Sequence, residues 1–589
     1  MAAGDQYRRI EPSDMLVFDD ENNLVGLRSG KSDSAEMRLG APLTAAQVQA
    51  VQSQVDRHYP CAHYADVSQA QEWTTASMTA GSAVLSVTGY TFGDQDIGKT
   101  VGVLGAGVVS GDYTVVANDG VLAATISSVT GGMAVLSVAA TNTVAGASCV
   151  FGFPIDDALS LAVAACEAAY AVDGVSGTVV FPPGRYIAVE PQPISSGVSL
   201  RGAGMDSTAI YVVKIVADAS NATTAPWIRR NASYASVGRY DQVNVSELTL
   251  IGTYYASSGA YGADTKMIHM SHTSNSKVWR VRIVDNPSTA VGYDESINCL
   301  VAENIILNPG RLATPTSSHG SAGGSGIGVA IGSISDVSMN IRNNYIKGKW
   351  TSSGGTGRNG INIEAASGIA DPPTYYGGVL IEGNFVEGFF NGIVDSGAIG
   401  TIVRGNTVRR CTHGIKAGTN GVSVGRIARD MAIVGNRVAD LFTVSPANNS
   451  IGIAATTTSA TKNSAGRILI ADNIVTGVAG GYGVQLLGQP SYPLRNVTVR
   501  NNHIMDSDLS GIRVYGNVYG LVIAGNQISG NGRTGGGSNN YPIKVESTVV
   551  WTDGRLDSNT YTDYQSVPTQ AATHNVHGSA VLTNVTIVA

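Results

Sequence analysis

The feature that most constrains this chain is a six-residue pattern that returns eight times between Val301 and Ile528. In every copy an Asn is preceded at minus three and followed at plus two by Val or Ile, as in I-E-G-N-F-V at Ile381–Val386. Such regularity indicates a repeated structural unit. The central residues are Asn304, Asn344, Asn384, Asn406, Asn436, Asn473, Asn502 and Asn526.

The spacing between copies distinguishes two kinds of repeat protein. By subtraction, successive Asn residues lie 40, 40, 22, 30, 37, 29 and 24 positions apart. Helical repeats keep a nearly fixed period because each unit packs as a whole on the next. Spacings that share a minimum but vary in length above it instead indicate short strands joined by loops of variable length. The sequence therefore predicts a coil of strands.

A second mark, Gly followed by Ile or Val, accompanies most copies, as at Gly392-Ile393 and Gly414-Ile415. Each rung of the coil then has at least two strands joined by a turn, with β-branched residues filling the interior. Asn suits the turn because it tolerates left-handed backbone angles and its side-chain amide can hydrogen-bond from rung to rung.

A family resemblance is carried by three motifs ahead of the repeats. P-I-D-D-A-L-S-L-A-V-A-A-C begins at Pro154, G-T-V-V-F-P-P-G-R-Y spans Gly177–Tyr186 and G-V-S-L-R-G-A-G spans Gly197–Gly204. With the repeats, they make the chain resemble a right-handed single-stranded parallel β-helix of the pectate-lyase type, and specifically a bacteriophage tailspike, from about Phe153 to Tyr561. The resemblance implies a homotrimer that binds and depolymerises a bacterial capsule, exopolysaccharide or O-antigen.

Four regions are expected on this basis. Residues 1–64 form a virion-attachment segment that docks onto a phage baseplate or tail protein, 65–152 a small β-rich module, 153–564 the β-helix with a capping helix at its start, and 565–589 a tail that caps the last rung or contacts other subunits. The attachment role follows from position in the resemblance and not from a motif.

Local patterns predict elements within these regions. Met15–Phe18 and Leu24–Leu27 flank a polar loop as a hairpin does, and residues 44–55 have the capping and apolar spacing of a short helix. Short alternating strands between Ala76 and Phe151, one of them at Tyr113–Val116, predict an antiparallel barrel or sandwich. Asp156–Tyr170 is the expected capping helix.

Composition excludes several partners. The net charge is -7 and basic runs are scarce, which argues against nucleic acid or an anionic membrane. The N-terminus lacks an apolar signal region and no run reaches the length of a membrane span. A protein made in the host cytoplasm and carried in the virion fits. The five cysteines are odd in number and lack metal-ligand spacing, so neither a disulfide framework nor a zinc site is expected. No metal and no cofactor are predicted.

Candidate catalytic residues come from the outward rows of the coil, where residues at equal register in successive rungs form ladders. Counted from the Gly of the second mark, Glu364 lies in the plus-four row, Asp395 lies one residue before its neighbour Ser396, and Asp294 lies about two rungs earlier in the same row. Glycosidic hydrolysis needs two carboxyl groups at the spacings that nearby rungs supply, and the predicted pair is Glu364 and Asp395, with Asp294 next in line. The alternative is that these are ordinary solvated carboxylates.

Loops of unusual length surround these rungs and are expected to form groove walls. They carry Trp350, Tyr375 and Tyr376, which are candidates to stack on sugar faces, although Trp350 alone could instead pack its loop on the coil. Lys416 and Arg358 complete the candidate substrate-binding residues.

Two other functions stay open. A polysaccharide lyase would act by β-elimination with a basic group, recruited from Lys416, His413, Arg358 or Arg513. A non-catalytic receptor-binding tail fibre would share every feature except paired carboxylates. Glycoside hydrolysis by the carboxyl groups is the prediction.

Overall fold

The structure is a computed structural model, and it divides into two compact units, Met1–Tyr59 and Pro60–Ala589. The residues it describes are 15–18, 24–28, 36–38, 58–60, 69–107, 120–216, 228–230, 239–257, 266–311, 324–331, 338–352, 358–364, 378–418, 429–444, 449–457, 466–532, 541–546, 549–562, 574–576 and 580–587.

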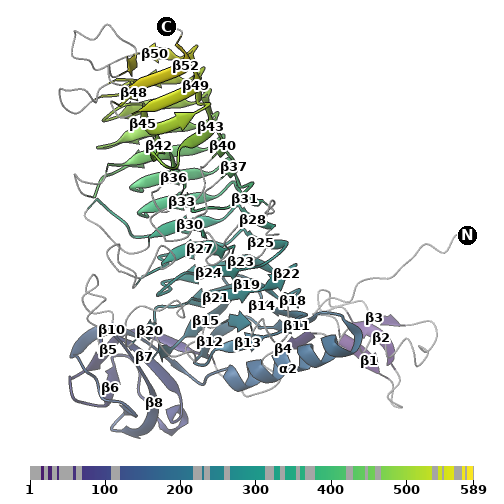
Figure 1. The fold of residues 1–589 in the computed structure, drawn as a ribbon. Helices are drawn as coiled ribbons and strands as arrows, with labels where there is room; N and C mark the ends of the chain where they lie inside the picture. Colours follow the sequence, from purple (N-terminus) through teal and green to yellow (C-terminus); the bar gives the residue numbers. More distant parts are fainter. Residues whose placement is uncertain are drawn as a thin grey trace, which may run out of the picture. The chain divides into compact units, whose positions relative to one another are not determined.

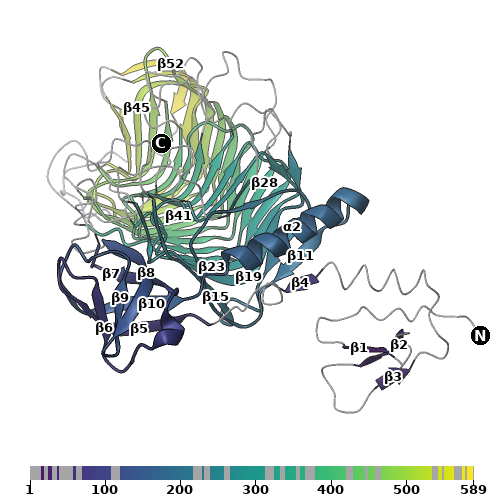
Figure 2. The same ribbon diagram turned by 90° about the horizontal axis from the view of Figure 1, so that it is seen from below.

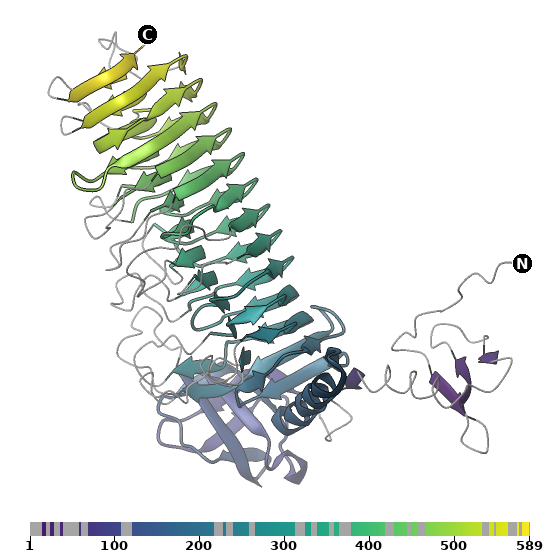
Figure 3. The same cartoon turned by 45° about the vertical axis from the view of Figure 1, so that its right-hand side comes forward.

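The second unit is dominated by one sheet of 39 strands, coiled so that strands stack in parallel rung upon rung (Figures 1 and 3). A typical rung consists of β28 (Met339–Arg342), β29 (Tyr345–Lys347) and β30 (Asn359–Glu364). These pair with β31, β32 and β33 of the next rung. The right-handed single-stranded parallel β-helix expected from the sequence is confirmed.

The strands stand in three columns along the coil. The first column comprises β11 (Gly177–Val180), β14 (Val198–Arg201), β19 (Asn244–Ile251), β23 (Lys277–Val284), β25 (Cys299–Ala302), β28, β31 (Val379–Glu382), β34 (Ile402–Arg404), β37 (Arg429–Val434), β40 (Gly466–Ala471), β43 (Leu494–Arg500), β46 (Val522–Ala524), β49 (Val550–Asp557) and β52 (Val581–Ile587). The second column comprises β12 (Gly184–Ala188), β15 (Thr208–Val212), β26 (Ile305–Leu307), β29, β32 (Phe385–Glu387), β35 (Thr407–Arg409), β38 (Arg437–Leu441), β41 (Ile474–Val478), β44 (His503–Ser507), β47 (Gln527–Ser529) and β50 (Thr560–Thr562). The third column comprises β13 (Gln192–Ile194), β17 (Ile228–Arg230), β21 (Ile268–Ser271), β24 (Val291–Asp294), β27 (Ser325–Ala330), β30, β33 (Asn391–Asp395), β36 (His413–Ala417), β39 (Ile451–Thr456), β42 (Tyr482–Gly488), β45 (Ile512–Tyr519), β48 (Ile543–Val545) and β51 (His574–Val576).

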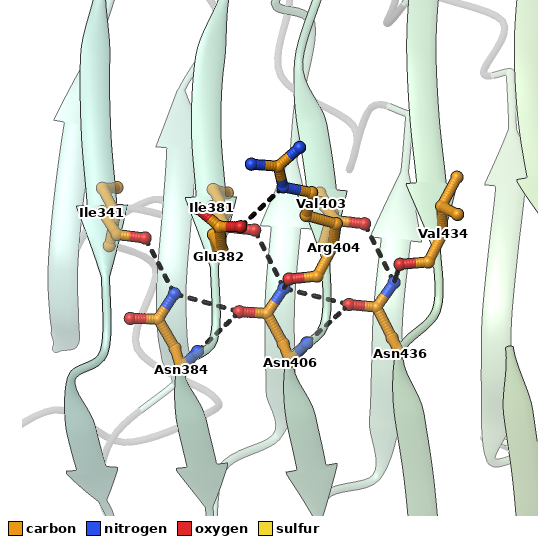
Figure 4. A network of polar contacts seen from close by, with 9 residues as sticks. All are labelled: Ile341, Ile381, Glu382, Asn384, Val403, Arg404, Asn406, Val434 and Asn436. Carbon is orange, nitrogen blue, oxygen red and sulfur yellow. Dashed lines mark hydrogen bonds and ion pairs between the residues drawn. The ribbon is translucent and has the colours of Figure 1, made fainter.

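A ladder of buried Asn side chains runs between the first and second columns (Figure 4). Nδ2 of Asn384 donates to Oδ1 of Asn406 at 3.0 Å and to the carbonyl of Ile341 at 2.9 Å. Asn406 repeats both contacts with Asn436 and Ile381. The predicted bonding from rung to rung is confirmed, and it extends from Asn304 to Asn559.

The reason given for Asn at the turn needs correction. The left-handed residue is the one before the ladder Asn, such as Asn343 at φ 55° or Gly383 at φ 64°, and the ladder Asn residues themselves are not left-handed. Asn is therefore required at the ladder for its amide rather than for its backbone freedom.

The interior of the coil is filled by rows of β-branched residues. One row runs through Ile381, Val403, Ile433, Ile470, Val499 and Ile523, all fully buried and paired in register. This row was predicted from the repeat and is confirmed. Its burial supplies the hydrophobic stabilisation of each rung.

A closed antiparallel barrel precedes the coil, in the order β10-β5-β6-β9-β8-β7. The barrel alternative is thus the correct one, although the predicted strand at Tyr113–Val116 lies outside the described residues. Its strands are β5 (Gln71–Met78), β6 (Val84–Val87), β7 (Thr100–Leu104), β8 (Val121–Thr130), β9 (Met133–Leu136) and β10 (Val144–Gly152), with a short 3-10 helix η2 (Asp94–Asp96).

Helix α2 (Asp156–Asp173) lies against the first rung, beside β11 and β13 (Figure 2). Leu159, Val163 and Cys166 form its buried face, as the sequence predicted. The helix ends at Gly174, whose φ of 70° closes a left-handed cap. No helix among the described residues is long and apolar enough to cross a membrane.

The two ends of the chain also carry strands. In the first unit, β1 (Met15–Phe18) and β2 (Leu24–Arg28) pair antiparallel, as the predicted hairpin requires, and β3 (Glu36–Arg38) joins them. The helix expected in residues 44–55 lies outside the described residues. At the other end, β52 pairs in parallel with β49 and so adds a further rung to the coil.

Strand β4 (His58–Pro60) belongs to the 39-stranded sheet, where it pairs with β11. Four short strands form two separate sheets, β16 (Lys214–Val216) with β20 (Tyr255–Ser257) and β18 (Tyr240–Asp241) with β22 (Thr273–Ser274).

Replacing one ladder Asn tests the role of the amide chain. Asn436→Ala should lower the free energy of unfolding by about 2–4 kcal/mol, because the backbone N–H of Asn406 and the carbonyl of Val403 lose the partners that the Asn436 side chain supplies. Gln527→Ala, at an exposed position of β47, is the control and should change it by less than about 0.5 kcal/mol. Urea denaturation measures both, and equal stability of the two variants would contradict the ladder's role.

Candidate functional site

Two outward rows of the third column meet at a group of ionisable side chains. In the first row His269 pairs with Gly292, Gly292 with Gly328, and Gly328 with Asn362. The second, called here the carboxylate row, consists of Ser271, Asp294, Ala330 and Glu364. Asp294 and Glu364 therefore lie two rungs apart in one row, as the sequence register predicted, with Cα atoms about 10 Å apart.

Small residues separate the two carboxyl groups. Gly328 and Ala330 occupy the rung between Asp294 and Glu364, and both are partly exposed. A Cβ at Gly292 would lie 3.1 Å from Cδ of Lys266, so this glycine lets the Lys266 side chain cross the rung. The result is a floor of small side chains flanked by charged ones.

Asp294 is held by two basic side chains. Nε2 of His269 lies 2.5 Å from Oδ2 of Asp294, and Nζ of Lys266 lies 3.6 Å from the same oxygen. Burial alone would raise the pKa of Asp294, but the positive charges and hydrogen bonds of His269 and Lys266 outweigh it. The pKa of this carboxyl is held well below its usual range, and Asp294 is ionised.

Glu364 has the opposite character. Burial, followed by the negative charge of Asp294, raises its pKa to about 7, against the smaller lowering effects of Lys266 and of Asn362, whose Nδ2 donates to Oε1 at 2.8 Å. Glu364 thus keeps its proton at pH values where Asp294 has long lost its own. Two carboxyl groups with pKa values driven apart are the usual arrangement for an acid and a base in one site.

A second polar chain lies beside Asp294. Oγ of Ser271 lies 2.8 Å from Nδ1 of His272, and Nε2 of His272 lies 2.9 Å from Oε2 of Glu295. His272 and Glu295 both have left-handed backbones, with φ of 53° and 48°. These contacts fix the turns that follow β21 and β24, and with them the end of the strand that carries Asp294.

Asp395 does not join this pair. The register aligns Asp395 with Ile363 rather than with Glu364, so it belongs to an inward row. Its side chain is fully buried, and Oδ1 accepts hydrogen bonds from the backbone N–H groups of Gly397 and Ala398 at 2.9 and 2.8 Å. The expected pairing of Glu364 with Asp395 is therefore corrected, because Asp395 caps a turn inside the coil.

The predicted aromatic contacts also need correction. Trp350 is 3% exposed, its Nε1 donates to Oγ1 of Thr412 at 3.1 Å, and its ring packs edge-on against Phe390. It packs its own loop on the coil, which is the alternative weighed above, and its ring is not available to a sugar. Tyr375 and Tyr376 lie outside the described residues.

The two predicted cations lie close to the rung of Glu364. Arg358 directly precedes β30, and Lys416 stands two rungs beyond Asn362 in the same row. Burial, together with the charge of Arg358, lowers the pKa of Lys416 to about 8. Burial and the charge of Lys416 lower the pKa of the neighbouring His413 to about 3, so its imidazole is neutral. A role for Arg358 and Lys416 in substrate binding stays a prediction.

Sequence reasoning missed Lys266 and His269. Both precede the clear Asn repeats, and no Gly-Ile mark sets their register. One signal could have identified His269. Inward apolar residues alternate with outward ones in Ile268–Ser271, and this segment aligns residue by residue with Val291–Asp294. Because apolar residues of that segment point inward, His269 had to lie in an outward row next to Asp294.

No protein-family model matches the sequence, and no curated protein matches it significantly. Among solved structures, the chain is similar to the A-module of the mannuronan C-5 epimerase AlgE4 of Azotobacter vinelandii (TM-score 0.43, 15% identity, 74% of this chain and 96% of that chain). It is similar to the surface protein and adhesin PfbA of Streptococcus pneumoniae (0.42, 12%, 74% and 96%). It is also similar to a variant of the tailspike protein of E. coli bacteriophage HK620 in complex with a pentasaccharide (0.42, 13%, 74% and 68%).

The coupling between the two carboxyl groups is testable directly. Asp294→Asn should lower the pKa of Glu364 from about 7, because it removes a negative charge that opposes ionisation of Glu364. A ¹³C NMR titration of selectively labelled Glu carboxyl groups measures the change, with the Glu364 signal assigned by its loss in Glu364→Gln. Asp472→Asn, at an exposed turn after β40, is the control and should leave that pKa unchanged. An unaltered pKa in Asp294→Asn would show that the carboxyl groups do not interact.

Proposed function

We propose that this protein hydrolyses glycosidic bonds of a bacterial surface polysaccharide at the Asp294–Glu364 pair. The observation that carries the proposal is the position of two carboxyl groups in one outward row, two rungs apart, with surroundings that shift their pKa values in opposite directions. An oxocarbenium-like transition state needs a protonated acid at the leaving oxygen and an ionised carboxylate on the other side of the sugar.

In this reaction Glu364 donates its proton to the glycosidic oxygen as the bond to the anomeric carbon breaks. Asp294 accepts a proton from the water that attacks that carbon, and His269 and Lys266 orient the carboxylate. A backbone separation of about 10 Å supports an inverting reaction, for which carboxyl groups lie about 6.5–9.5 Å apart, more than a retaining one at about 5–5.5 Å.

Substitution of the pair tests the proposal. Glu364→Gln and Asp294→Asn should each lower kcat by about 10²–10⁴ while binding of polysaccharide persists, because acid and base assistance act on the transition state. Reducing-end release from purified capsular polysaccharides and O-antigens measures kcat. The activity of the unaltered protein should fall as pH rises through about 7, since Glu364 must be protonated.

Glu382→Gln is the matched control for these variants. Glu382 is an outward carboxylate of the first column that pairs with Arg404 at 2.7 Å, so its loss should leave kcat unchanged. Near-normal turnover by both site variants would move the active site elsewhere. No reducing-end release from any of these polysaccharides would refute hydrolysis itself.

One observation favours a second candidate reaction, β-elimination on a uronic acid polymer. A lyase needs a base near the sugar and a cation to neutralise the uronate carboxylate. His269 and Lys266 lie together, with Nε2 and Nζ 3.3 Å apart, at the edge of the same floor of small residues. Products that absorb in the ultraviolet as unsaturated uronides would favour this reaction over hydrolysis.

The biological setting is part of the proposal. The motifs at Gly177–Tyr186 and Gly197–Gly204 resemble phage tailspikes, so we propose that the chain is a component of the virion. Residues 1–64 would then attach it to a baseplate or tail protein and the coil would meet the host polysaccharide. If the carboxylate pair is inactive, we propose instead that the protein is a receptor-binding fibre without catalysis.

The proposed homotrimer is supported by an apolar row on the outside of the first column. Outward positions of a strand are ordinarily polar. Here most of them are occupied by partly exposed apolar side chains, and Ile402 is 40% exposed. Exposed apolar rows of this extent mark contact surfaces, and side-by-side copies would cover them. The apolar members of the row are Leu300, Leu380, Ile402, Ala432, Leu469 and Val522, and the polar residues Asn340 and Thr498 hold the other two rungs.

A charge in the middle of the row tests this contact. Ile402→Lys should convert the trimer to single chains, because association would bury an unpaired ammonium group. Light scattering after size exclusion gives the mass of the assembly. Val138→Lys changes an apolar residue of the barrel module that is at least as exposed, and it should leave the mass at three chains. A single-chain mass for the unaltered protein, or a trimer of Ile402→Lys, would contradict the proposal.

A further inference from the structure

A second cluster of aromatic and charged residues lies farther along the third column. Arg513 of β45 stands between two tyrosine rings, with Cζ 4.7 Å from the centroid of Tyr482 and 5.2 Å from that of Tyr515. Nε of Arg513 donates to Oε1 of Glu546 at 2.9 Å, and Nζ of Lys544 reaches the same oxygen at 3.0 Å. The five residues form one connected group, called here the Tyr515 platform.

The platform is rigid on its inner side and open on its outer side. Tyr482 is 3% exposed and the side chain of Lys544 is 7% exposed, so both are fixed by packing. Tyr515 is 37% exposed, although its ring rests on a guanidinium group that is itself anchored by Glu546. A flat aromatic ring that stays in place at the surface loses little entropy when a ligand covers it.

The platform shares the register of the carboxylate row. Val514 aligns with Ile363 through Asp395, Ala417, Ala455 and Leu486, so Tyr515 holds the position that Glu364 holds five rungs earlier, about 24 Å away. Between them Ser396, Gly418 and Thr456 are buried, and Leu487, next to Tyr515 in the row, is partly exposed. The platform is therefore a separate exposed place on the same face of the coil as the carboxylate pair.

We propose that the Tyr515 platform is a carbohydrate-binding site, distinct from the Asp294–Glu364 site, in which a sugar ring stacks on Tyr515 and the Arg513 guanidinium donates hydrogen bonds to its oxygens. The apolar face of a pyranose ring fits a flat amphipathic ring, and a neighbouring guanidinium supplies donors in a fixed fork. The choice of a bacterial polysaccharide as ligand rests on the proposed function.

Charge narrows the ligand further. Arg513 and Lys544 carry two positive charges against the one negative charge of Glu546, so the platform is cationic by one charge. A sugar that carries a carboxylate or a similar acidic substituent is attracted to it, whereas a polycation is not. A polymer bound here remains attached while a different stretch of it occupies the carboxylate row, which raises the local concentration of cleavable bonds.

The test measures binding in the Glu364→Gln background, so that no polysaccharide is cleaved. The probe is an array of immobilised bacterial capsular polysaccharides and O-antigens. Tyr515→Ala should weaken binding about tenfold to every polysaccharide that the parent binds, and Tyr515→Phe should bind as the parent does, because it keeps the ring. Tyr519→Ala is the matched control. Tyr519 lies in the same strand with Arg495 over its ring at 4.7 Å, but at its first-column end, and its loss should leave binding unchanged.

The outcomes separate this inference from the proposed function. The platform is not a carbohydrate site if the Tyr515→Ala variant binds polysaccharide as tightly as the Tyr519→Ala variant. The same conclusion follows if the parent protein binds no polysaccharide on the array. Light scattering on each variant ensures that a difference in assembly is not read as a difference in affinity. If the unaltered protein cleaves none of the bound polysaccharides, hydrolysis fails while a Tyr515-dependent loss of binding still supports the platform.

Discussion

The amide chain of the Asn ladder is the interaction on which the rest of this structure depends. Each ladder Asn bonds to the Asn and backbone of neighbouring rungs, so a polar group is satisfied at the centre of an otherwise apolar bend. A slip of one residue would turn every inward β-branched side chain outward and leave these amides unpaired. The ladder thereby fixes the register of all three columns, including the third.

That fixed register explains how a chemically ordinary set of residues becomes a site. Asp294 and Glu364 are 70 positions apart in sequence, and the coil sets them two rungs apart in one row. The small residues Gly292, Gly328 and Ala330 leave the surface between the two carboxyl groups free of bulky side chains. His269 and Lys266 keep Asp294 ionised. Ionised Asp294 in turn makes ionisation of Glu364 harder. The base of the proposed reaction thus helps to keep its acid protonated.

The same rows show why some expectations failed. Counting from the Gly mark placed Glu364 correctly, but Asp395 is one position away, and in a strand one position is the difference between surface and interior. Its carboxyl group caps a turn instead of facing Glu364. Trp350 was expected on a groove wall because loops carry it, yet burial against Phe390 and a bond to Thr412 hold it in the coil. Loop residues have no periodicity from which direction can be read.

The sequence by itself determined the coil, its rung register and the buried rows, because Asn and β-branched spacing reflect contacts that recur identically in every rung. It also placed Asp294 and Glu364 in one row. Only the tertiary structure decided their chemistry, because protonation depends on burial and on His269 and Lys266, whose strand carries no repeat mark. The Tyr515 platform likewise needed coordinates: the stacking of Arg513 between Tyr482 and Tyr515 and its bond to Glu546 join side chains from three successive rungs.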